Sequence, residues 1–218
     1  MAEYNYGDAY LRYPLGAGPY MFDDGSTIQV HDIFNPLPAF MKSADLIFAD
    51  PPWNLGNINT FYTKADKTER VDSFERFYKC LFGRIWEISP QVCYVEVGKE
   101  HLADFIMEMR KLYKYTTFYN STYYHSKDKL CYVIRGSNKA KKPSLDRMDE
   151  EDIIEWICSN EDYNIIGDLC MGRGLIGLNA YRNKKRFVGT ELNHKRLSVL
   201  IESIEREKKL KNHKMVTN

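Results

Sequence analysis

The residues with the clearest chemical potential form the tetrapeptide Asp50-Pro51-Pro52-Trp53, which directly follows the apolar run 46–49. Four consecutive apolar residues are typical of a short strand that is buried on both faces of a parallel sheet. Because proline cannot donate to a strand ladder, we expect this strand to end at Pro51. A carboxylate at the carboxyl end of such a strand lies where open α/β sheets bind their ligands. The sequence therefore places Asp50 in a ligand site, beside a backbone that the prolines hold rigid.

These groups suit chemistry at the exocyclic amine of a nucleobase. Such an amine is a poor nucleophile because its lone pair is delocalised into the ring. The Asp50 carboxylate and the Pro51 carbonyl could accept the two amine hydrogens, which would free the lone pair to attack an electrophilic methyl group. Trp53 offers a flat surface on which a base swung out of its helix could stack. The alternative interpretation is a proline turn with Trp53 packed in the core.

A second candidate site spans residues 165–175, where an apolar run leads to Gly172 and Gly174 and then to a predicted helix. Glycines in such a turn let the backbone approach a ligand, and the following helix N-terminus offers unpaired N–H groups. Glu191 ends the next predicted strand, about 20 residues later, where an acid can accept hydrogen bonds from ribose hydroxyls. The unit predicts a nucleotide-type pocket. A dinucleotide enzyme is the rival interpretation, but the third glycine at its usual offset is absent.

Hydrophobic patterns predict the elements that must position these groups. The predicted strands are 27–31, 45–49, 91–97, 165–169 and 187–190, with a hairpin of 115–124 and 129–135. The predicted helices are 36–41, 73–88 with Ser73 as N-cap, 100–113, 148–159 and 193–210. Residues 54–72 are polar and lack periodicity, so we predict a long loop there, a candidate lid or nucleic-acid clamp.

Composition limits the class of protein. A length of 218 residues fits one domain, and we expect an N-terminal arm at 1–26 and a single domain at 27–218. No apolar run reaches membrane-spanning length, so no membrane partner is expected. The five cysteines include no Cys-x-x-Cys pair and the five histidines do not cluster with them. We therefore predict reduced cysteines, a cytoplasmic location and no metal site. The formal net charge is only +1, although basic clusters occur.

Together, the two motifs resemble those of the S-adenosylmethionine-dependent amino-methyltransferases, which act on adenine N6 or cytosine N4. The order, with the catalytic motif first, resembles the permuted β-type, and the resemblance covers residues 27–210. It implies an α/β fold of the Rossmann-like class I methyltransferase type. That fold has a seven-stranded, mostly parallel sheet with one antiparallel strand and helices on both faces. Strand 165–169 would be central, between 187–190 and 45–49, and the hairpin would close one edge.

The resemblance assigns catalysis to Asp50, Pro51, Pro52 and Trp53. It implies that S-adenosylmethionine is held by residues of both motifs and their surroundings, namely Asp32, Asp50, Pro143, Asp168, Cys170, Gly172, Gly174, Glu191, Leu192 and Asn193. Contacts with nucleic acid are expected from nearby polar and basic residues, namely Asn54, Asn57, Lys64, Lys139 and Lys141.

The sequence also departs from the family pattern. Leu169-Cys170 and Arg173 replace a usual Pro-Phe and Ser, and Leu175-Ile176 replace threonines, which removes hydroxyl donors near the cofactor. The segment between Arg135 and the next helix is too short for a separate target-recognition domain. Small loops, a homodimer or a second subunit would then select the target, or target specificity would be low. We expect a DNA N6-adenine methyltransferase; the alternatives are an RNA N6-adenine or DNA N4-cytosine methyltransferase, and a non-catalytic subunit that binds nucleic acid or a partner.

Overall fold

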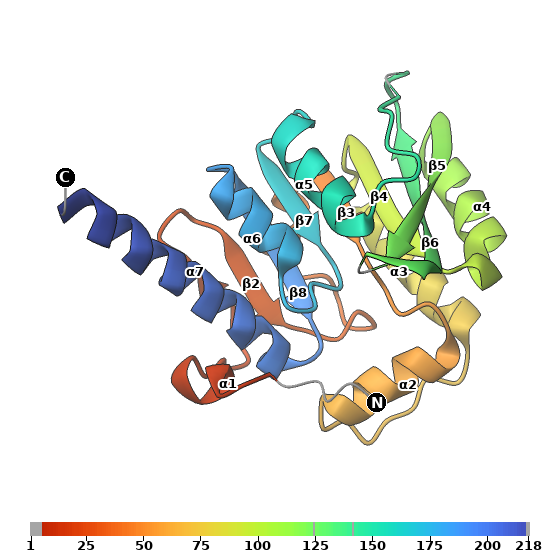
Figure 1. Cartoon of the computed structure of the whole chain (residues 1–218). Helices are drawn as coiled ribbons and strands as arrows, with labels where there is room; N and C mark the ends of the chain where they lie inside the picture. The colour runs from red at the N-terminus through yellow and green to blue at the C-terminus, as the bar shows by residue number, and fades with distance from the viewer. Residues whose placement is uncertain (1–5, 124, 141, 217–218) are drawn as a thin grey trace.

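The computed structural model describes residues 6–123, 125–140 and 142–216, which form an eight-stranded sheet with helices on both faces (Figure 1). The strand order is β1-β2-β8-β7-β3-β4-β6-β5. The strands are β1 (Tyr20–Met21), β2 (Thr27–Val30), β3 (Leu46–Ala49), β4 (Val92–Val97), β5 (Tyr115–Tyr123), β6 (Ser126–Ser137), β7 (Ile165–Asp168) and β8 (Arg186–Glu191). The helices are α1 (Ala9–Arg12), η1 (Ala39–Ser43), α2 (Leu55–Lys64), α3 (Phe74–Ile88), η2 (Lys99–His101), α4 (Leu102–Leu112), α5 (Glu150–Asn160), α6 (Leu175–Arg182) and α7 (His194–Val216).

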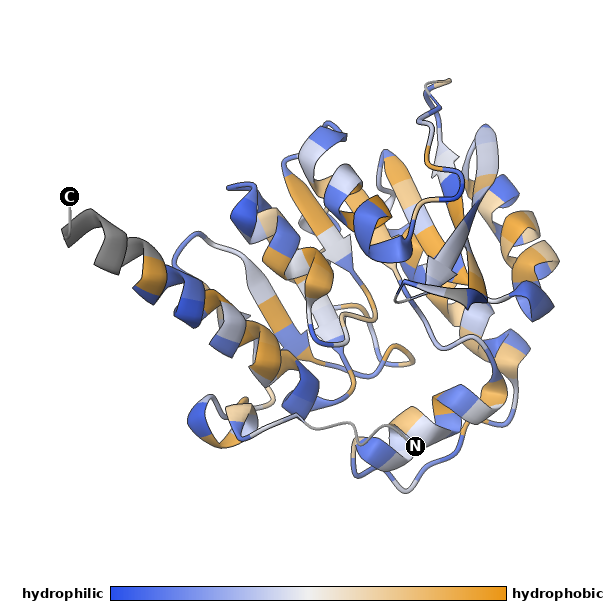
Figure 2. Ribbon diagram, in the orientation of Figure 1, coloured by the Kyte–Doolittle hydropathy of each residue, from blue (hydrophilic) through white to orange (hydrophobic). Residues whose placement is uncertain are grey.

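The central strands are apolar on both sides because two cores sandwich the sheet. In β3, Ile47 packs in a core with residues of α2, α3 and α4, whereas Leu46 and Phe48 pack in a second core with α5, α6 and α7. Side chains alternate across a strand, so consecutive apolar residues serve opposite faces. Figure 2 shows hydrophobic residues concentrated on the inner strands, with hydrophilic ones on the outer helix faces. Among the described residues, no helix is both long and apolar enough to cross a membrane.

The predicted strand order is confirmed around the central strand. β7 lies between β8 and β3, and the β5–β6 hairpin closes one edge of the sheet. β2, β8, β7, β3 and β4 run parallel, and β6 is antiparallel to both of its neighbours. The sheet has eight strands rather than the predicted seven, because Tyr20–Met21 in the predicted arm pairs antiparallel with β2.

The prediction of a loop at 54–72 is wrong for its first half, which forms α2. Asn54 caps this helix, accepting a hydrogen bond from the Asn57 backbone N–H at 2.9 Å. Only Ile58 and Tyr62 of α2 are buried, so the apolar stripe is too narrow to give a periodic signal. The Asn59 side chain then pairs with both backbone groups of Val71, which fixes the returning segment.

A buried ion pair joins the sheet to the end of α5. Arg135 on β6 donates to Glu161 at 3.2 Å and to the Tyr94 hydroxyl on β4 at 2.9 Å, and that hydroxyl donates to Glu161 at 2.6 Å. Both charged side chains are buried. Removal of one partner would leave an uncompensated buried charge, which is more costly than loss of the whole pair.

We predict that Glu161→Ala lowers the free energy of unfolding by about 3–5 kcal/mol, because Arg135 would remain buried without its counterion. Urea unfolding monitored by circular dichroism measures this change. The exposed Glu155 on the same helix is the matched control, and Glu155→Ala should change stability by less than about 0.5 kcal/mol. Equal effects of the two substitutions would contradict a structural role for the pair.

Candidate active site

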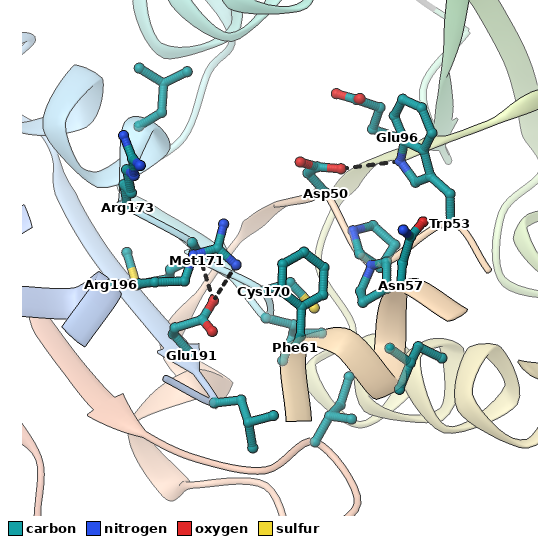
Figure 3. A pocket seen from close by; sticks show the side chains of 18 of the residues that line it. Asp50, Trp53, Asn57, Phe61, Glu96, Cys170, Met171, Arg173, Glu191 and Arg196 are labelled. Carbon is teal, nitrogen blue, oxygen red and sulfur yellow. Dashed lines mark hydrogen bonds and ion pairs between the residues drawn. The ribbon is translucent and has the colours of Figure 1, made fainter. Parts of the chain in front are cut away.

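The two sequence motifs meet because β3 and β7 are hydrogen-bonded neighbours that run parallel. Leu46 pairs with Ile166 and Ile47 with Gly167, so Asp50 and the turn after Asp168 emerge at the same edge of the sheet. Gly167 permits this approach, since a Cβ there would lie 2.5 Å from Ile47 Cδ1. The tetrapeptide and the glycine turn line one cavity of about 680 Å³ (Figure 3).

Trp53 is partly buried and lines this cavity rather than filling the core. Its indole Nε1 donates to Asp50 Oδ1 at 3.3 Å. The ring lies against Gly98, where a Cβ would come within 3.0 Å of Cε3, and contacts the Tyr123 ring at a centroid separation of 4.9 Å. These contacts orient the indole beside the carboxylate, so the interpretation of Trp53 as core filling is wrong.

The Asp50 carboxyl group has unusual acid–base properties. Burial raises its pKa to about 6, and the nearby Glu191 charge acts in the same direction. Arg196 and the hydrogen bond from Trp53 oppose this shift by favouring the charged form. Asp50 is therefore mostly ionised at neutral pH, yet it can take up a proton only slightly below that pH.

The glycine turn is organised around the buried Glu191 at the end of β8. The Gly172 N–H donates to Glu191 Oε2 at 2.8 Å, and the Asn193 N–H donates to Oε1 at 3.0 Å. Gly172 has a φ of 54°, and a Cβ there would lie 2.8 Å from Arg196 Nη2. The Arg196 guanidinium approaches Glu191 Oε2 at 3.8 Å (Figure 3). Glycine at 172 thus leaves room both for the bend and for the arginine.

Gly174 and Asp168, two residues predicted to bind the cofactor, support the turn but do not line the cavity. Gly174 precedes α6 with a φ of 80°, and a Cβ there would lie 2.6 Å from Leu200 Cδ2 on α7. Asp168 is buried and accepts a hydrogen bond from the Cys170 N–H at 2.8 Å. Burial raises the pKa of Asp168, which favours its protonated form.

α2 forms another wall of the cavity, close to Asp32, which follows β2. The Tyr62 hydroxyl donates to the Asp32 carboxylate, at 2.8 Å from each oxygen, and the Phe34 N–H donates to Oδ1 at 3.1 Å. Phe61 lines the cavity one residue earlier, with the Arg196 guanidinium 5.0 Å from its ring centroid. The segment predicted as a loop therefore supplies a helical wall of the site.

The structure brings most of the predicted catalytic and cofactor residues into one cavity. The predicted residues that line it are Asp32, Asp50, Pro51, Pro52, Trp53, Asn57, Cys170, Gly172, Glu191 and Leu192. The described residues predicted for the site that are not among its lining are Asn54, Lys64, Lys139, Pro143, Asp168, Gly174 and Asn193. Lys141 lies outside the described residues.

Three of the predicted residues that do not line the cavity are found elsewhere in the structure. Asn193 binds the Lys64 carbonyl through Nδ2 at 2.9 Å, which links the end of α2 to the start of α7. Pro143 is buried, and the exposed Lys139 donates its backbone N–H to Ser137 Oγ at 3.0 Å.

Sequence reasoning missed several residues that line the cavity, namely Phe61, Glu96, Tyr123, Glu150, Arg173 and Arg196. Glu96 did carry a signal, since it is the only charged residue in the apolar strand Val92–Val97. Arg196 and Phe61 carried none, because single residues on a helix do not reveal which neighbours they will meet.

Among the residues that the structure describes, two clusters of ionisable side chains have ligand atoms close enough to hold a cation. In each cluster these atoms lie within 4.8 Å of one another: Glu96, Cys131 and Glu150 in one, and His125, Asp149 and Glu151 in the other. The first cluster is buried and the second is partly exposed. The sequence did not suggest either cluster, because their members come from separate elements.

We predict that the Trp53 indole N–H resonance shifts with a midpoint of about pH 6 in ¹H–¹⁵N spectra, because its acceptor Asp50 becomes ionised there. Trp53→Phe identifies the peak, and Asp50→Asn should abolish the step. A midpoint at the usual aspartate value of 3.8 would contradict the effect of burial.

No protein-family model matches the chain, and neither does any curated protein. Solved structures do match it. M1.HpyAVI in complex with S-adenosylmethionine has a TM-score of 0.55 and 13% identity, over 81% of this chain and 98% of the other. TTHA0409 of Thermus thermophilus, described as a DNA modification methylase, has a TM-score of 0.54 and 16% identity, over 76% and 88%. Its complex with S-adenosylmethionine has a TM-score of 0.53 and 15% identity, over 76% and 87%. The chain therefore has the Rossmann-like α/β fold of DNA methyltransferases.

Proposed function

We propose that the protein transfers a methyl group from S-adenosylmethionine to the exocyclic amine of a nucleobase, N6 of adenine in DNA. The observation that carries this proposal is the shared cavity: the tetrapeptide that suits an amine and the glycine turn that suits a nucleotide line the same space. The complexes of M1.HpyAVI and TTHA0409 with S-adenosylmethionine support the choice of methyl donor.

The residues of the cavity fit such a cofactor. Asp32 follows β2, and Glu191 is the last residue of β8. The two strands pair in parallel with Val30 opposite Glu191, so the two acids lie at one end of the cavity. We assign Glu191 to the ribose hydroxyls and Asp32 to the adenine of the cofactor. Gly172 has no side chain, so the turn stays open to a ligand. Cys170 and Leu192 also line the cavity. When bound, S-adenosylmethionine supplies a methyl group on a positively charged sulfur.

In this proposal, Asp50 and the Pro51 carbonyl accept the two hydrogens of the target amine. These acceptors favour a tetrahedral nitrogen whose lone pair is free to form the new nitrogen–carbon bond as the sulfur–carbon bond breaks. Trp53 stacks on the flipped base. Asp50 need not take the proton before attack, because the amine becomes acidic only once the new bond forms. Catalysis then rests on positioning and on preorganised electrostatics.

The direct test is incubation with labelled S-adenosylmethionine and a panel of duplex DNA, single-stranded DNA and RNA. Digestion of the product to nucleosides identifies the methylated base. N6-methyladenine in DNA supports the proposal. N4-methylcytosine or methylated RNA would instead support the alternative acceptors, and absence of transfer despite cofactor binding would support a non-catalytic subunit. Short loops or a second subunit would select the target sequence.

We predict that Asp50→Ala lowers the rate of transfer by about 10³-fold, because the amine loses a charged acceptor in a site with little water. Calorimetry should find cofactor affinity largely unchanged, which separates catalysis from binding. Undiminished methylation by this variant would contradict the mechanism.

We predict that Glu191→Ala weakens S-adenosylmethionine binding by at least about tenfold, through loss of hydrogen bonds to a charged group. Calorimetry on the variant measures the change. Glu202→Ala is the matched control, because that glutamate lies on α7 and pairs with Arg12. Equal affinities of the two variants would mean that the cofactor binds elsewhere.

A further inference from the structure

A second pair of carboxyl groups lines the cavity beside Asp50. Glu96 lies on β4 and is 1% exposed, and Glu150 is the first residue of α5 and is 4% exposed. Both contribute to the lining of the cavity, and their carboxyl oxygens come within 4.8 Å of each other. Figure 3 shows Glu96 on the side of the cavity that holds Asp50 and Trp53. The roles proposed above for Asp50 and Trp53 do not require this pair.

One buried oxygen of each carboxyl group in the pair is not satisfied. Glu96 Oε1 and Glu150 Oε2 have no hydrogen-bond partner among the residues that the structure describes. A buried ionised carboxylate without a donor is strongly unfavourable, and two carboxylates that face each other cannot both remain charged. The pair therefore retains a proton, which gives it one O–H donor beside several acceptor oxygens.

The surrounding groups reinforce this state. The ionisable groups that act on the pair are Asp50 after β3, Cys131 on β6, the α5 N-cap Asp149 and Glu151 in α5. Burial is the main cause that raises the pKa of Glu96 above its usual range and that of Glu150 to about 8, with the Asp50 charge adding to both shifts. Burial also raises the pKa of Cys131 to about 12, so the thiol adds no charge at neutral pH.

We propose that the Glu96–Glu150 pair recognises the acceptor base by donating its shared proton in a hydrogen bond to the ring nitrogen next to the amine. This inference rests on the proposed function. In adenine that nitrogen is N1, and in cytosine it is N3; both accept hydrogen bonds. Asp50 and the Pro51 carbonyl are acceptors, and the Trp53 N–H is directed at Asp50. The protonated pair adds an O–H donor beside these groups, and this donor complements the ring nitrogen on the amine-bearing edge.

This arrangement would discriminate bases by the pattern of donors along one edge. Adenine and cytosine present an amine donor beside a ring acceptor, which matches Asp50 followed by the protonated pair. Guanine and thymine present a carbonyl beside a ring N–H. Their carbonyl would meet the acceptor Asp50, and their ring N–H would meet the O–H donor of the pair. A mismatch of this kind leaves buried polar groups unpaired, and such mismatches give strong selectivity. The pair is accordingly a specificity-determining element for an amine-bearing base.

The experiment compares adenine with 1-deazaadenine, which lacks the N1 acceptor, at the position that the protein methylates in a single-stranded oligonucleotide. Wild-type protein should transfer about tenfold more slowly to the deaza base, the value of one hydrogen bond to such a group. Glu96→Leu should be slower on adenine and should show no further loss on 1-deazaadenine. If the methylated base is cytosine, 3-deazacytosine replaces the purine analogue.

Conservative variants separate recognition from folding. Glu96→Gln keeps an N–H donor that cannot ionise, so it should retain the preference for adenine over 1-deazaadenine that Glu96→Leu loses. Glu155→Gln, on the exposed face of α5, should behave as the wild type. Thermal unfolding checks that each variant is folded.

An infrared measurement tests the shared proton without any activity. The spectrum of the wild type should contain a protonated carboxyl band at neutral pH that the double variant Glu96→Gln/Glu150→Gln lacks. Absence of that band would overturn the inference, as would an equal deaza effect in the wild type and Glu96→Leu. Loss of activity in a chelator with recovery in Mg²⁺ or Zn²⁺ would also overturn it, because the cluster would then be a metal site. A wild type that methylates no base would refute the proposed function, and the infrared result would still decide the state of the pair.

Discussion

The structure depends on the parallel pairing of β3 with β7, which brings the ends of two distant segments together. Asp45 strengthens this pairing where the strands begin, since its carboxylate accepts hydrogen bonds from the backbone N–H groups of Asn164 at 2.9 Å and Ile165 at 3.0 Å. Without that register, Asp50 and the glycine turn would not share a cavity. The strand order thus determines where the proposed site forms, and the side chains at the strand ends determine its chemistry.

Acids dominate the inside of the cavity. Asp50, Glu96, Glu150 and Glu191 all line it, and Asp168 lies directly behind. Arg196 is placed among them, close to Glu191 and with an influence that favours the charged forms of Asp50 and Asp168. An accumulation of carboxyl groups costs stability unless protons or cations offset it. A cavity of this kind suits a ligand that carries a positive charge, and a protonated pair offsets part of the remaining repulsion.

Much of the fold could be predicted from the sequence, because buried strands and turn residues produce local signals. The apolar runs of β3 and β7 and the N-cap Ser73, which accepts a hydrogen bond from the Arg76 N–H, are confirmed in the structure. α2 was missed because it buries few side chains. β1 was missed because a strand of two residues has no periodicity, and it exists only through its pairing with β2.

The candidate site was predictable to the extent that its residues belong to motifs. Asp50 and Gly172 stand in segments whose local pattern indicates their position. Arg196, Phe61 and Glu150 reach the cavity from helices whose faces are set by packing, which a single sequence does not specify. Gly174 shows a further limit of prediction from sequence. A side chain at this position would clash with Leu200, which lies on another helix, and the local sequence does not reveal that contact.

The order of the strands along the chain has a consequence for how the protein matures. β3 is made early, but its neighbour β7 and the next strand β8 arise only in the last quarter of the chain. During synthesis the emerging polypeptide therefore carries β3 and β2 with open edges at the centre of the future sheet, and contacts between such distant segments form slowly. Ribosome-bound chains that end before residue 165 would contain Asp50 and Trp53 but lack the glycine turn and Glu191. The protein therefore completes its cavity, and pairs the open edges of β2 and β3, only after β7 and β8 have left the ribosome.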